Sequence, residues 1–358
     1  MATSNAQRFL AKGGVDDELA LTMFYNRVLE AFHAKTLFWN AVGPEGVGAD
    51  VIPSQMIASE MVSQGKSWQF IQVALDDGAV DEHVPGTELL GQQFELDEGL
   101  ITIDQILVKH YDIPVDQIQL SHFNVIAPVA RKLGRGLATD MDIKLLRLSL
   151  LAARAAAVTK NGMTIHNGGN SLVRTAANVA TAYPVTTTGA TNFIDDAYAL
   201  AELMDNDNVP DEGRYLVITP YIRRVLSKAP DSLFSNDFDA GQFNKLNRRL
   251  VGLVAGFNLT FPTNHMPTTD VVTGPAKYQG DFTAAGAGTG QPVSVALCGA
   301  DEGNAAIGYV AATHPELGPI YTHIGFDERR NTQFLKGQMM VGADILSPFC
   351  AGEIAVHD

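Results

Sequence analysis

The sequence predicts an α+β fold in which extended appendages accompany compact regions. Two patterns lead to this prediction. Apolar residues recur every three or four positions from about Val115 to Ala157, which is typical of one very long helix, and they alternate along both ends of segment 66–104, which is typical of a long β-hairpin. The chain has 358 residues, 46% of them hydrophobic, so it can bury one large core or two moderate ones.

Residues 1–65 are expected to form an arm rather than a domain. A helix from about Asp17 to Ala34 begins in an acidic cluster, which suits the positive end of a helix dipole. Glycines and prolines between Gly43 and Pro53 then interrupt regular structure. Such a segment gains little by packing on itself, so we expect it to lie along another surface.

Residues 66–104 are expected to form the hairpin, with a wide tip. Strand-like alternation at both ends encloses the segment Asp76–Leu90, which is rich in charge and contains Pro85-Gly86. From Asp76 to Asp104 there are nine acidic residues and no Lys or Arg. The hairpin is therefore expected to present a strongly acidic surface.

The long helix follows the hairpin. At about 1.5 Å per residue, a helix of roughly 42 residues would be roughly 60 Å long. Pro128, Gly134 and Gly136 are expected to bend or weaken it near its first third. A helix of this length cannot bury its apolar stripe against one small domain, so it either spans two domains or lies along neighbouring subunits. Between Val115 and Lys160 the chain carries seven basic residues against three aspartates.

The remainder of the chain is expected to form a compact α/β region with strands towards the C-terminus. Thr219-Pro220 is its most specific signal, because Thr caps a helix and Pro suits the first helical position. The expected elements, in order, are a helix from Phe193 to about Asp205 capped by Asn192, a strand over Arg214–Ile218, a helix from Pro220 through Lys228, a helix near Gly241–Leu250, a strand over Ala255–Phe261, an exposed loop over 271–292, and strands over Ala306–Ala312 and Gly337–Leu346.

Composition narrows the class of protein. A net charge of −15 argues against a nucleic-acid-binding surface. The two cysteines, Cys298 and Cys350, are far apart in the sequence and are expected to be buried thiols in a reducing cytoplasm rather than a disulfide. The N-terminus lacks the apolar core of a signal peptide, and no apolar run reaches 18 residues, so we expect a soluble intracellular product with no membrane span.

The motifs that carry chemistry are incomplete. Gly65-Lys66-Ser67 has Glu60 where a phosphate-binding loop needs its first glycine, and a strand-like run follows where a helix is needed. Asp205-Asn206-Asp207-Asn208 is followed by Val209-Pro210 where a calcium loop needs a ligand and a glycine. The nine histidines form no metal pair at helical spacing, and no nucleophile elbow occurs. We therefore expect no enzyme, and no catalytic, cofactor or metal site.

Short motifs nevertheless follow one another in a characteristic order along nearly the whole chain. They are Gly65-Lys66-Ser67 entering Trp68-Gln69-Phe70, Val84-Pro85-Gly86-Thr87-Glu88-Leu89, Gly99–Asp104, His110-Tyr111-Asp112, Val209–Val217 with Pro220, Ala255–Pro262 with Pro267, Arg329-Arg330, and Gly337–Gly342. In this order the chain resembles the major capsid proteins of tailed double-stranded DNA bacteriophages, which have the Hong Kong 97 type fold. It is most similar to those of short-tailed podophages.

This resemblance implies a division of the chain and a structural role. It implies an N-terminal arm (1–65), an E-loop hairpin (66–104), a peripheral domain with the spine helix (105–190), an axial domain (191–325), and C-terminal strands that return to the peripheral domain (326–358). It also implies a shell subunit that self-assembles as hexamers and pentamers into an icosahedral phage head, enclosing double-stranded DNA without binding it specifically.

The resemblance further implies partners and a location. The partners would be other copies of the chain, a separate scaffolding protein during assembly and a portal protein at one vertex, with room for a decoration protein. The product would be part of the virion and would assemble in the host bacterial cytoplasm. Two alternatives stay open: an encapsulin-like compartment subunit, and an α/β enzyme with no recognisable site.

An acidic hairpin next to a basic helix would find its counterpart on an identical copy, because contacts between like subunits can use both surfaces at once. The alternative is that both are ordinary solvated charged faces. The candidate inter-subunit contacts are Asp76, Asp77, Asp81, Glu82, Glu88, Arg131, Lys132, Arg135, Lys144, Arg147, Arg329 and Arg330.

Overall fold

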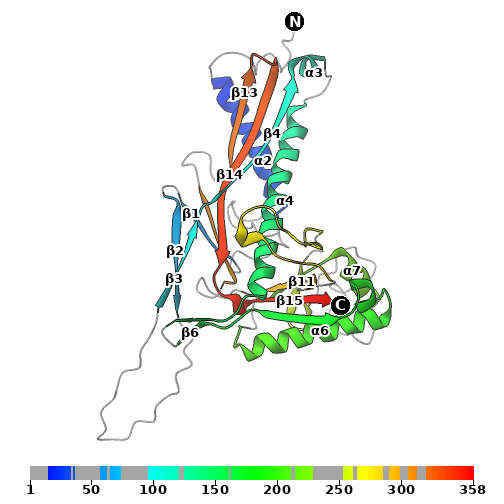
Figure 1. The fold of residues 1–358 in the computed structure, drawn as a ribbon. Helices are drawn as coiled ribbons and strands as arrows, with labels where there is room; N and C mark the ends of the chain where they lie inside the picture. The colour runs from blue at the N-terminus through cyan, green and yellow to red at the C-terminus, as the bar shows by residue number, and fades with distance from the viewer. Residues whose placement is uncertain are drawn as a thin grey trace, which may run out of the picture.

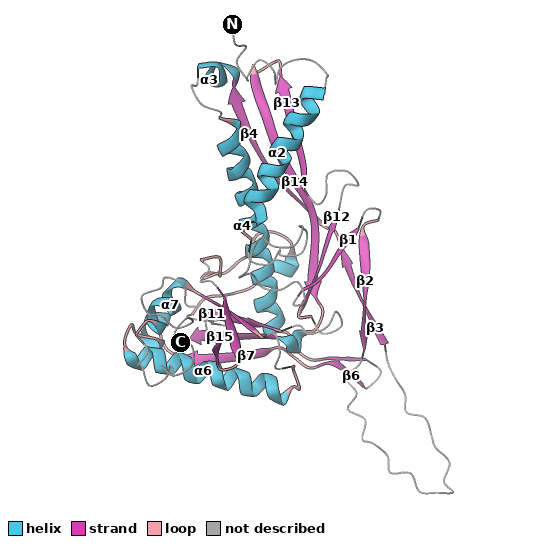
Figure 2. Ribbon diagram, turned by 180° about the vertical axis from the view of Figure 1, so that it is seen from behind, coloured by secondary structure: helices cyan, strands magenta, loops and turns pink. Residues whose placement is uncertain are grey.

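The computed structural model describes residues 15–33, 35–36, 57–62, 65–73, 96–120, 125–160, 163–210, 214–228, 253–260, 264–284, 290–298, 305–312 and 320–358. Figure 1 shows an elongated part, in which a long helix lies beside long strands, and a compact part that contains the C-terminus. The same two parts are seen from behind in Figure 2, with a two-stranded hairpin projecting beside them.

The elongated part is built on a five-stranded sheet around β14 (Thr332–Ile345). Four strands lie in the order β1-β12-β14-β13, and β4 pairs with β14 along the edge opposite β13. The other strands are β1 (Ile57–Val62), β4 (Gln105–Pro114), β12 (Ile307–Ala312) and β13 (Tyr321–Asp327). Side chains alternate along β4 and β14, which buries Leu107, Ile113, Leu335 and Met339 on one face of the sheet.

The compact part contains a six-stranded mixed sheet in the order β7-β15-β11-β8-β10-β9. Its strands are β7 (Asn170–Thr175), β8 (Tyr215–Ile218), β9 (Leu253–Val254), β10 (Phe257–Thr260), β11 (Gln291–Leu297) and β15 (Ala351–His357). Helix α6 (Thr187–Asn206) packs on β7 and β15 and also contacts α7 (Pro220–Leu226). The central strands β11 and β15 are buried along nearly their whole length, as is typical of strands covered on both faces.

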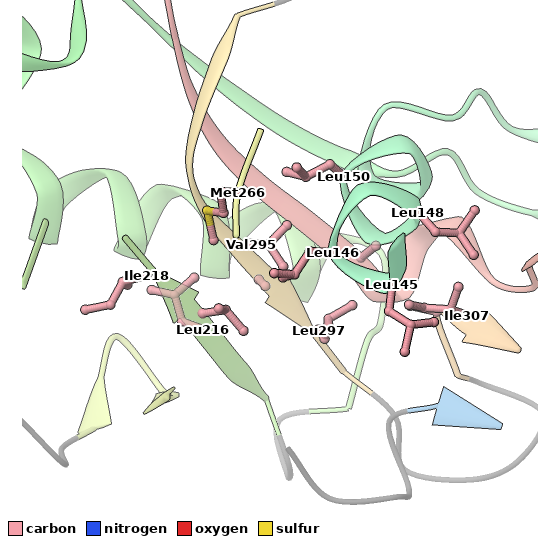
Figure 3. Packing of buried hydrophobic residues seen from close by; sticks show 14 of the residues in the cluster. Leu145, Leu146, Leu148, Leu150, Leu216, Ile218, Met266, Val295, Leu297 and Ile307 are labelled. Atoms are coloured by element: carbon pink, nitrogen blue, oxygen red, sulfur yellow. The ribbon is translucent and has the colours of Figure 1, made fainter. Parts of the chain in front are cut away.

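Helix α4 (Ile126–Ala153) joins the two parts. It packs against β4 and β14 in the elongated part and against β11 and β15 in the compact part. Figure 3 shows leucines of its last turns beside the compact sheet, with Leu146 next to Val295 of β11. One continuous cluster of buried apolar residues runs through both parts. Of the two predicted roles for the long helix, the one that the described residues show is spanning two parts of one chain.

The long helix is shorter than predicted. Residues Val115–Leu120 form a separate helix, α3, residue 125 is in a bend, and residues 121–124 lie outside the described residues. The predicted end at Ala157 is wrong: α4 ends at Ala153 with Arg154 as its C-cap, and β5 (Val158–Lys160) follows. The 28 residues of α4 correspond to about 42 Å.

Pro128 lies in the first turn of α4, where a missing backbone N–H costs no helical hydrogen bond. The predicted bend at this residue is therefore replaced by a helix start. The helix also continues through Gly134 and Gly136, whose contacts are described below.

The helix predicted in the arm is confirmed as α2 (Val15–His33), and it packs on α4 and β13 of its own chain. Phe24, Val28 and Phe32 of α2 are buried to 3% exposure or less. Gly134 of α4 lets the two backbones approach, because a Cβ there would overlap the carbonyl oxygen of Val28. Beyond α2, the described part of the arm is Lys35, Thr36, Gly65 and strand β1. Strand β1 pairs in parallel with β12.

The predicted hairpin is confirmed at its base. Strands β2 (Ser67–Val73) and β3 (Leu96–Thr102) are antiparallel, with Trp68 opposite Ile101. The tip, residues 74–95, lies outside the described residues. A second, smaller hairpin joins β5 to β6 (Met163–His166).

The helix starts of the compact part were predicted with mixed success. Thr219 caps α7 as expected and accepts a hydrogen bond from the backbone N–H of Ile222 at 3.4 Å. The predicted start of α6 is wrong: its N-cap is Thr186, and Asn192 lies within the helix and donates to the carbonyl oxygen of Ala182 at 3.3 Å. Thr and Gly are weak helix formers, so the sequence of residues 187–191 does not predict a helix. This segment becomes helical through its packing in the folded chain.

Three further predictions concern irregular segments. The strand expected from Ala255 begins at Phe257, because Ala255 and Gly256 form a turn with φ of 51° and 83°. The expectation that 271–292 is an exposed loop is wrong in part: Tyr278 of the short helix η2 (Ala276–Tyr278) and Phe282 are buried, and β11 begins at Gln291. The helix expected near 241–250 lies outside the described residues.

Two features bear on the predicted protein class. No helix among the described residues combines the length and the hydropathy that crossing a membrane requires. Cys298 and Cys350 are buried thiols that are not joined in a disulfide. They are neighbours across two strand ends, where the N–H of Cys298 donates to the carbonyl oxygen of Cys350 at 2.9 Å. Burial, with a smaller effect from Cys298, raises the pKa of the Cys350 thiol, so this group stays protonated.

Candidate functional site

The sequence-predicted contact residues that the structure describes lie mainly on α4. Arg131, Lys132 and Arg135 are exposed on the first turns of this helix. None of the three side chains has an ion pair or hydrogen bond to any described residue. They therefore form a strip of uncompensated positive charge, which we call the α4 basic strip.

Two further predicted residues lie on the later turns of α4. The ammonium of Lys144 pairs with Asp140 at 2.9 Å, one helical turn earlier, which is a weak surface interaction. Arg147 is half-buried, and its Nε is buried without a hydrogen-bond partner among the described residues. A desolvated polar group of this kind is costly unless something outside the described residues satisfies it.

A tyrosine links the basic strip to the neighbouring strand. The Lys132 ammonium lies 5.6 Å from the centroid of the Tyr111 ring, and the Lys109 ammonium lies 6.0 Å from it. Lys109 and Tyr111 are on β4, on the side that faces α4, in line with the buried Leu107 and Ile113. Lys109 and Tyr111 were not among the predicted contact residues. Their alternation with Leu107 and Ile113 was the signal that could have identified them.

Arg329 and Arg330 lie in the turn between β13 and β14. Arg330 is 3.8 Å from Asp112 and 4.0 Å from Asp327, but its side chain is 72% exposed, so these pairs contribute little to stability. Asn331 completes the turn with φ of 49°, and its carbonyl oxygen accepts a hydrogen bond from Val115 at 3.1 Å.

The acidic members of the predicted set are Asp76, Asp77, Asp81, Glu82 and Glu88, and all of them lie outside the described residues. Whether they contact the basic residues therefore stays a prediction.

Arg154, at the end of α4, does not add to the basic surface, because its side chain is bound in a buried network. Its Nε donates to Glu353 Oε1 at 2.7 Å, and its other nitrogens donate to the carbonyl oxygens of Asp281 and Gly290 at 2.8 and 2.9 Å. Ser171 also donates to Glu353 Oε1, at 2.7 Å, and the Glu353 side chain is fully buried. This network holds the end of α4 on the compact sheet. Glu353 in the middle of an apolar strand was its sequence signal, because a buried carboxylate requires a partner.

A second, partly buried network is also structural. Arg174 of β7 makes two hydrogen bonds to Asp196 of α6, at 2.7 and 2.8 Å, and Tyr183 donates to the same carboxylate at 2.6 Å. Burial and this acidic neighbour raise the pKa of the Tyr183 hydroxyl. The described residues contain no group of three or more His, Cys, Asp or Glu side chains that could hold a metal ion. The arrangement of the described site thus favours contacts between charged surfaces.

Comparison with known proteins gives a consistent result. A family model described as Gp10A-like major capsid protein matches residues 78–354. The solved capsid of cyanophage P-SCSP1u is 24% identical, with a TM-score of 0.67 over 90% of this chain and 94% of that one. The mature capsid of bacteriophage PhiM1 is 17% identical, with a TM-score of 0.63 over 89% and 90%. The capsid of Ralstonia phage GP4 is 13% identical, with a TM-score of 0.54 over 88% and 93%. No curated protein matches the sequence.

Proposed function

The chain belongs to the Gp10A-like family of major capsid proteins, and from that premise we propose that it self-assembles as hexamers and pentamers into the icosahedral head of a phage. The family match over 78–354 is the observation that carries its role as a capsid shell subunit. Its α+β fold is of the Hong Kong 97 phage capsid type, as the similarity to solved capsids over about nine-tenths of the chain establishes.

We also propose how neighbouring copies meet. The acidic residues of the hairpin tip (Asp76, Asp77, Asp81, Glu82 and Glu88) lie on the basic residues of an adjacent copy. The absence of acidic partners for Arg131, Lys132 and Arg135 among the described residues supports this, as does the buried, unpartnered Nε of Arg147. Arg329 and Arg330 would contact a further copy at the turn between β13 and β14. Lys144 would contribute less, because Asp140 already compensates its charge.

The remaining expectations are part of the same proposal. The shell encloses double-stranded DNA without specific binding, and assembly in the host bacterial cytoplasm uses a separate scaffolding protein, with a portal at one vertex and room for a decoration protein. The role is structural, so we infer that the chain is no enzyme. The division at 1–65, 66–104, 105–190, 191–325 and 326–358 is retained as a proposal, although strands from distant segments share each sheet.

Neither alternative function has a specific observation in its favour. An encapsulin-like compartment is not favoured, because the matching family is one of major capsid proteins. An α/β enzyme would need a convergent polar pocket, whereas the Arg154–Glu353 and Arg174–Asp196 networks are ion pairs that hold helices on a sheet.

The direct test is negative-stain electron microscopy of the purified, concentrated protein, with light scattering for mass. Closed shells, or rings of five and six subunits, are the expected result. A chain that stays monomeric, even with a scaffolding protein supplied, would refute the proposal. For the contact surface, Arg135→Glu should impair shell formation, whereas Lys144→Glu on the same helix is the control and should impair it less. Equal effects of the two variants would argue against the α4 basic strip as a contact.

A further inference from the structure

We propose that Lys109, Lys132 and Tyr111 form a site for a side-chain carboxylate of a second copy of this chain, and that Gly136 keeps the site open. This inference rests on the proposed function, since it names residues through which copies of a shell subunit would attach. It adds to the α4 basic strip a strand residue, an aromatic ring and a glycine.

The first observation is the convergence of two cations on one ring. Lys109 comes from β4 and Lys132 from α4, and both ammonium groups lie within 6.0 Å of the Tyr111 centroid. Cation–π attraction steadies the two side chains but does not neutralise their charges. Two positive charges held near one ring repel each other, and a single anion beside them would relieve that repulsion.

The second observation is that neither lysine is compensated by a carboxylate of the described residues. Several other described cations do have a carboxylate within 4 Å: Lys144 with Asp140, Arg154 with Glu353, Arg174 with Asp196, Arg214 with Asp205, Lys277 with Asp104, and Arg330 with Asp112. Lys109 and Lys132 have no carboxylate or hydrogen-bond partner among the described residues. The described residues therefore supply the two cations of the site but not the anion, which we assign to another molecule.

The third observation concerns Gly136, one helical turn after Lys132. A Cβ at this position would overlap the ammonium nitrogen and the last carbons of Lys109. Glycine normally weakens a helix interior, but here its missing side chain provides the space in which the Lys109 ammonium lies. Gly136 is thus a positioning residue for the site.

A carboxylate of a second copy is the anion that fits best. The chain has 40 acidic and 25 basic residues, so every copy carries an excess of carboxylates. Nine of them fall between Asp76 and Asp104 without any Lys or Arg. A nucleic-acid phosphate has the right charge, but a net charge of −15 per chain opposes the approach of a polyanion. Phosphate binding is therefore an outcome of the test.

The test compares shell formation by the full chain and by the variants Lys109→Ala, Lys132→Ala and Gly136→Ala, using light scattering against protein concentration. Each lysine variant should raise the concentration at half-assembly by about threefold, the size expected for an exposed ion pair. Lys144→Ala, the control, removes a charge that is already paired and should change it less. Gly136→Ala should give the same shift as the lysine variants although the net charge is unchanged, and its melting temperature should not fall. At about 1 M salt these differences should vanish, because charges are then screened within about 3 Å.

The other outcomes are distinct. If all three variants assemble as the wild type does, the site holds no subunit contact and the inference is wrong. If they assemble normally but bind a labelled DNA duplex more weakly, as measured by fluorescence anisotropy, the anion is a phosphate and the inference is again wrong. A wild-type chain that forms no shells refutes the proposed function itself, and that result is visible before any variant is compared.

Discussion

The same substitution, glycine to alanine, is expected to have opposite effects at two neighbouring positions of α4. Alanine favours a helix interior over glycine by about 1 kcal/mol, and this gain applies to both Gly134 and Gly136. At Gly136 the new methyl group displaces only the flexible end of Lys109. Gly136→Ala should therefore stabilise the chain by about 1 kcal/mol.

At Gly134 the new methyl group meets backbone instead. It would overlap the carbonyl oxygen of Val28 and lie 3.1 Å from the backbone nitrogen of Phe32. Helix α2 must then move away from α4, and overpacking of this kind costs about 1–3 kcal/mol. After the helical gain is subtracted, Gly134→Ala should destabilise the chain by about 1 kcal/mol. Complete detachment of α2 would expose Phe24, Val28 and Phe32, which alone would cost roughly 4.5–9 kcal/mol.

Urea unfolding of the unassembled variants measures this difference, because shell formation would add its own stabilisation. The two variants should differ by about 2 kcal/mol. Hydrogen exchange supplies the local readout. Compared with the wild type, the exchange rate of the amides of 15–33 should be higher in Gly134→Ala and the same in Gly136→Ala. Equal stabilities, or unchanged exchange in α2, would refute the close packing of α2 on α4.

Three further predictions concern buried groups. Glu353→Gln leaves the Arg154 charge uncompensated and should cost about 3 kcal/mol in urea unfolding, and a loss below about 1 kcal/mol would contradict a structural role for the pair. Burial, together with nearby Lys35, lowers the pKa of His265. The unfolded chain therefore binds the extra proton more readily, and stability should fall as the pH drops below about 6.5. His265→Gln should flatten that dependence, and an unchanged slope would count against it. The raised pKa of Cys350 predicts that its thiol resists alkylation at neutral pH until the chain is denatured, so modification of the folded chain would contradict its burial.

Only part of the candidate surface could be predicted from the sequence, and the criterion was the local density of charge. Arg131, Lys132 and Arg135 were recognisable because basic residues accumulate on the predicted helix. The same criterion could not separate Lys144, which Asp140 compensates, or Arg154, which Glu353 compensates from 199 residues away. Charge density is a property of sequence, whereas compensation depends on which side chains the fold brings together.

The same distinction between local sequence and tertiary contacts applies to the fold. Local signals determined the elements that depend on nearby residues: the Thr219-Pro220 helix start, the strands of the hairpin base, and the apolar stripe of α4. The order of short motifs then determined the resemblance to phage capsid proteins, which the family match confirms.

Only the tertiary structure decided where the long helix begins and ends and what it touches. In a helix that begins at Val115, Pro128 would lie in the interior and cause a bend. In the observed helix, which begins at Ile126, Pro128 lies in the first turn. Gly134 and Gly136 look alike in the sequence, yet one admits the backbone of α2 and the other the side chain of Lys109. The physical reason is that the residues around a glycine in the sequence do not indicate which atoms will occupy the space of its missing Cβ. Its effect depends on the atom that occupies the space, and distant parts of the chain supply that atom.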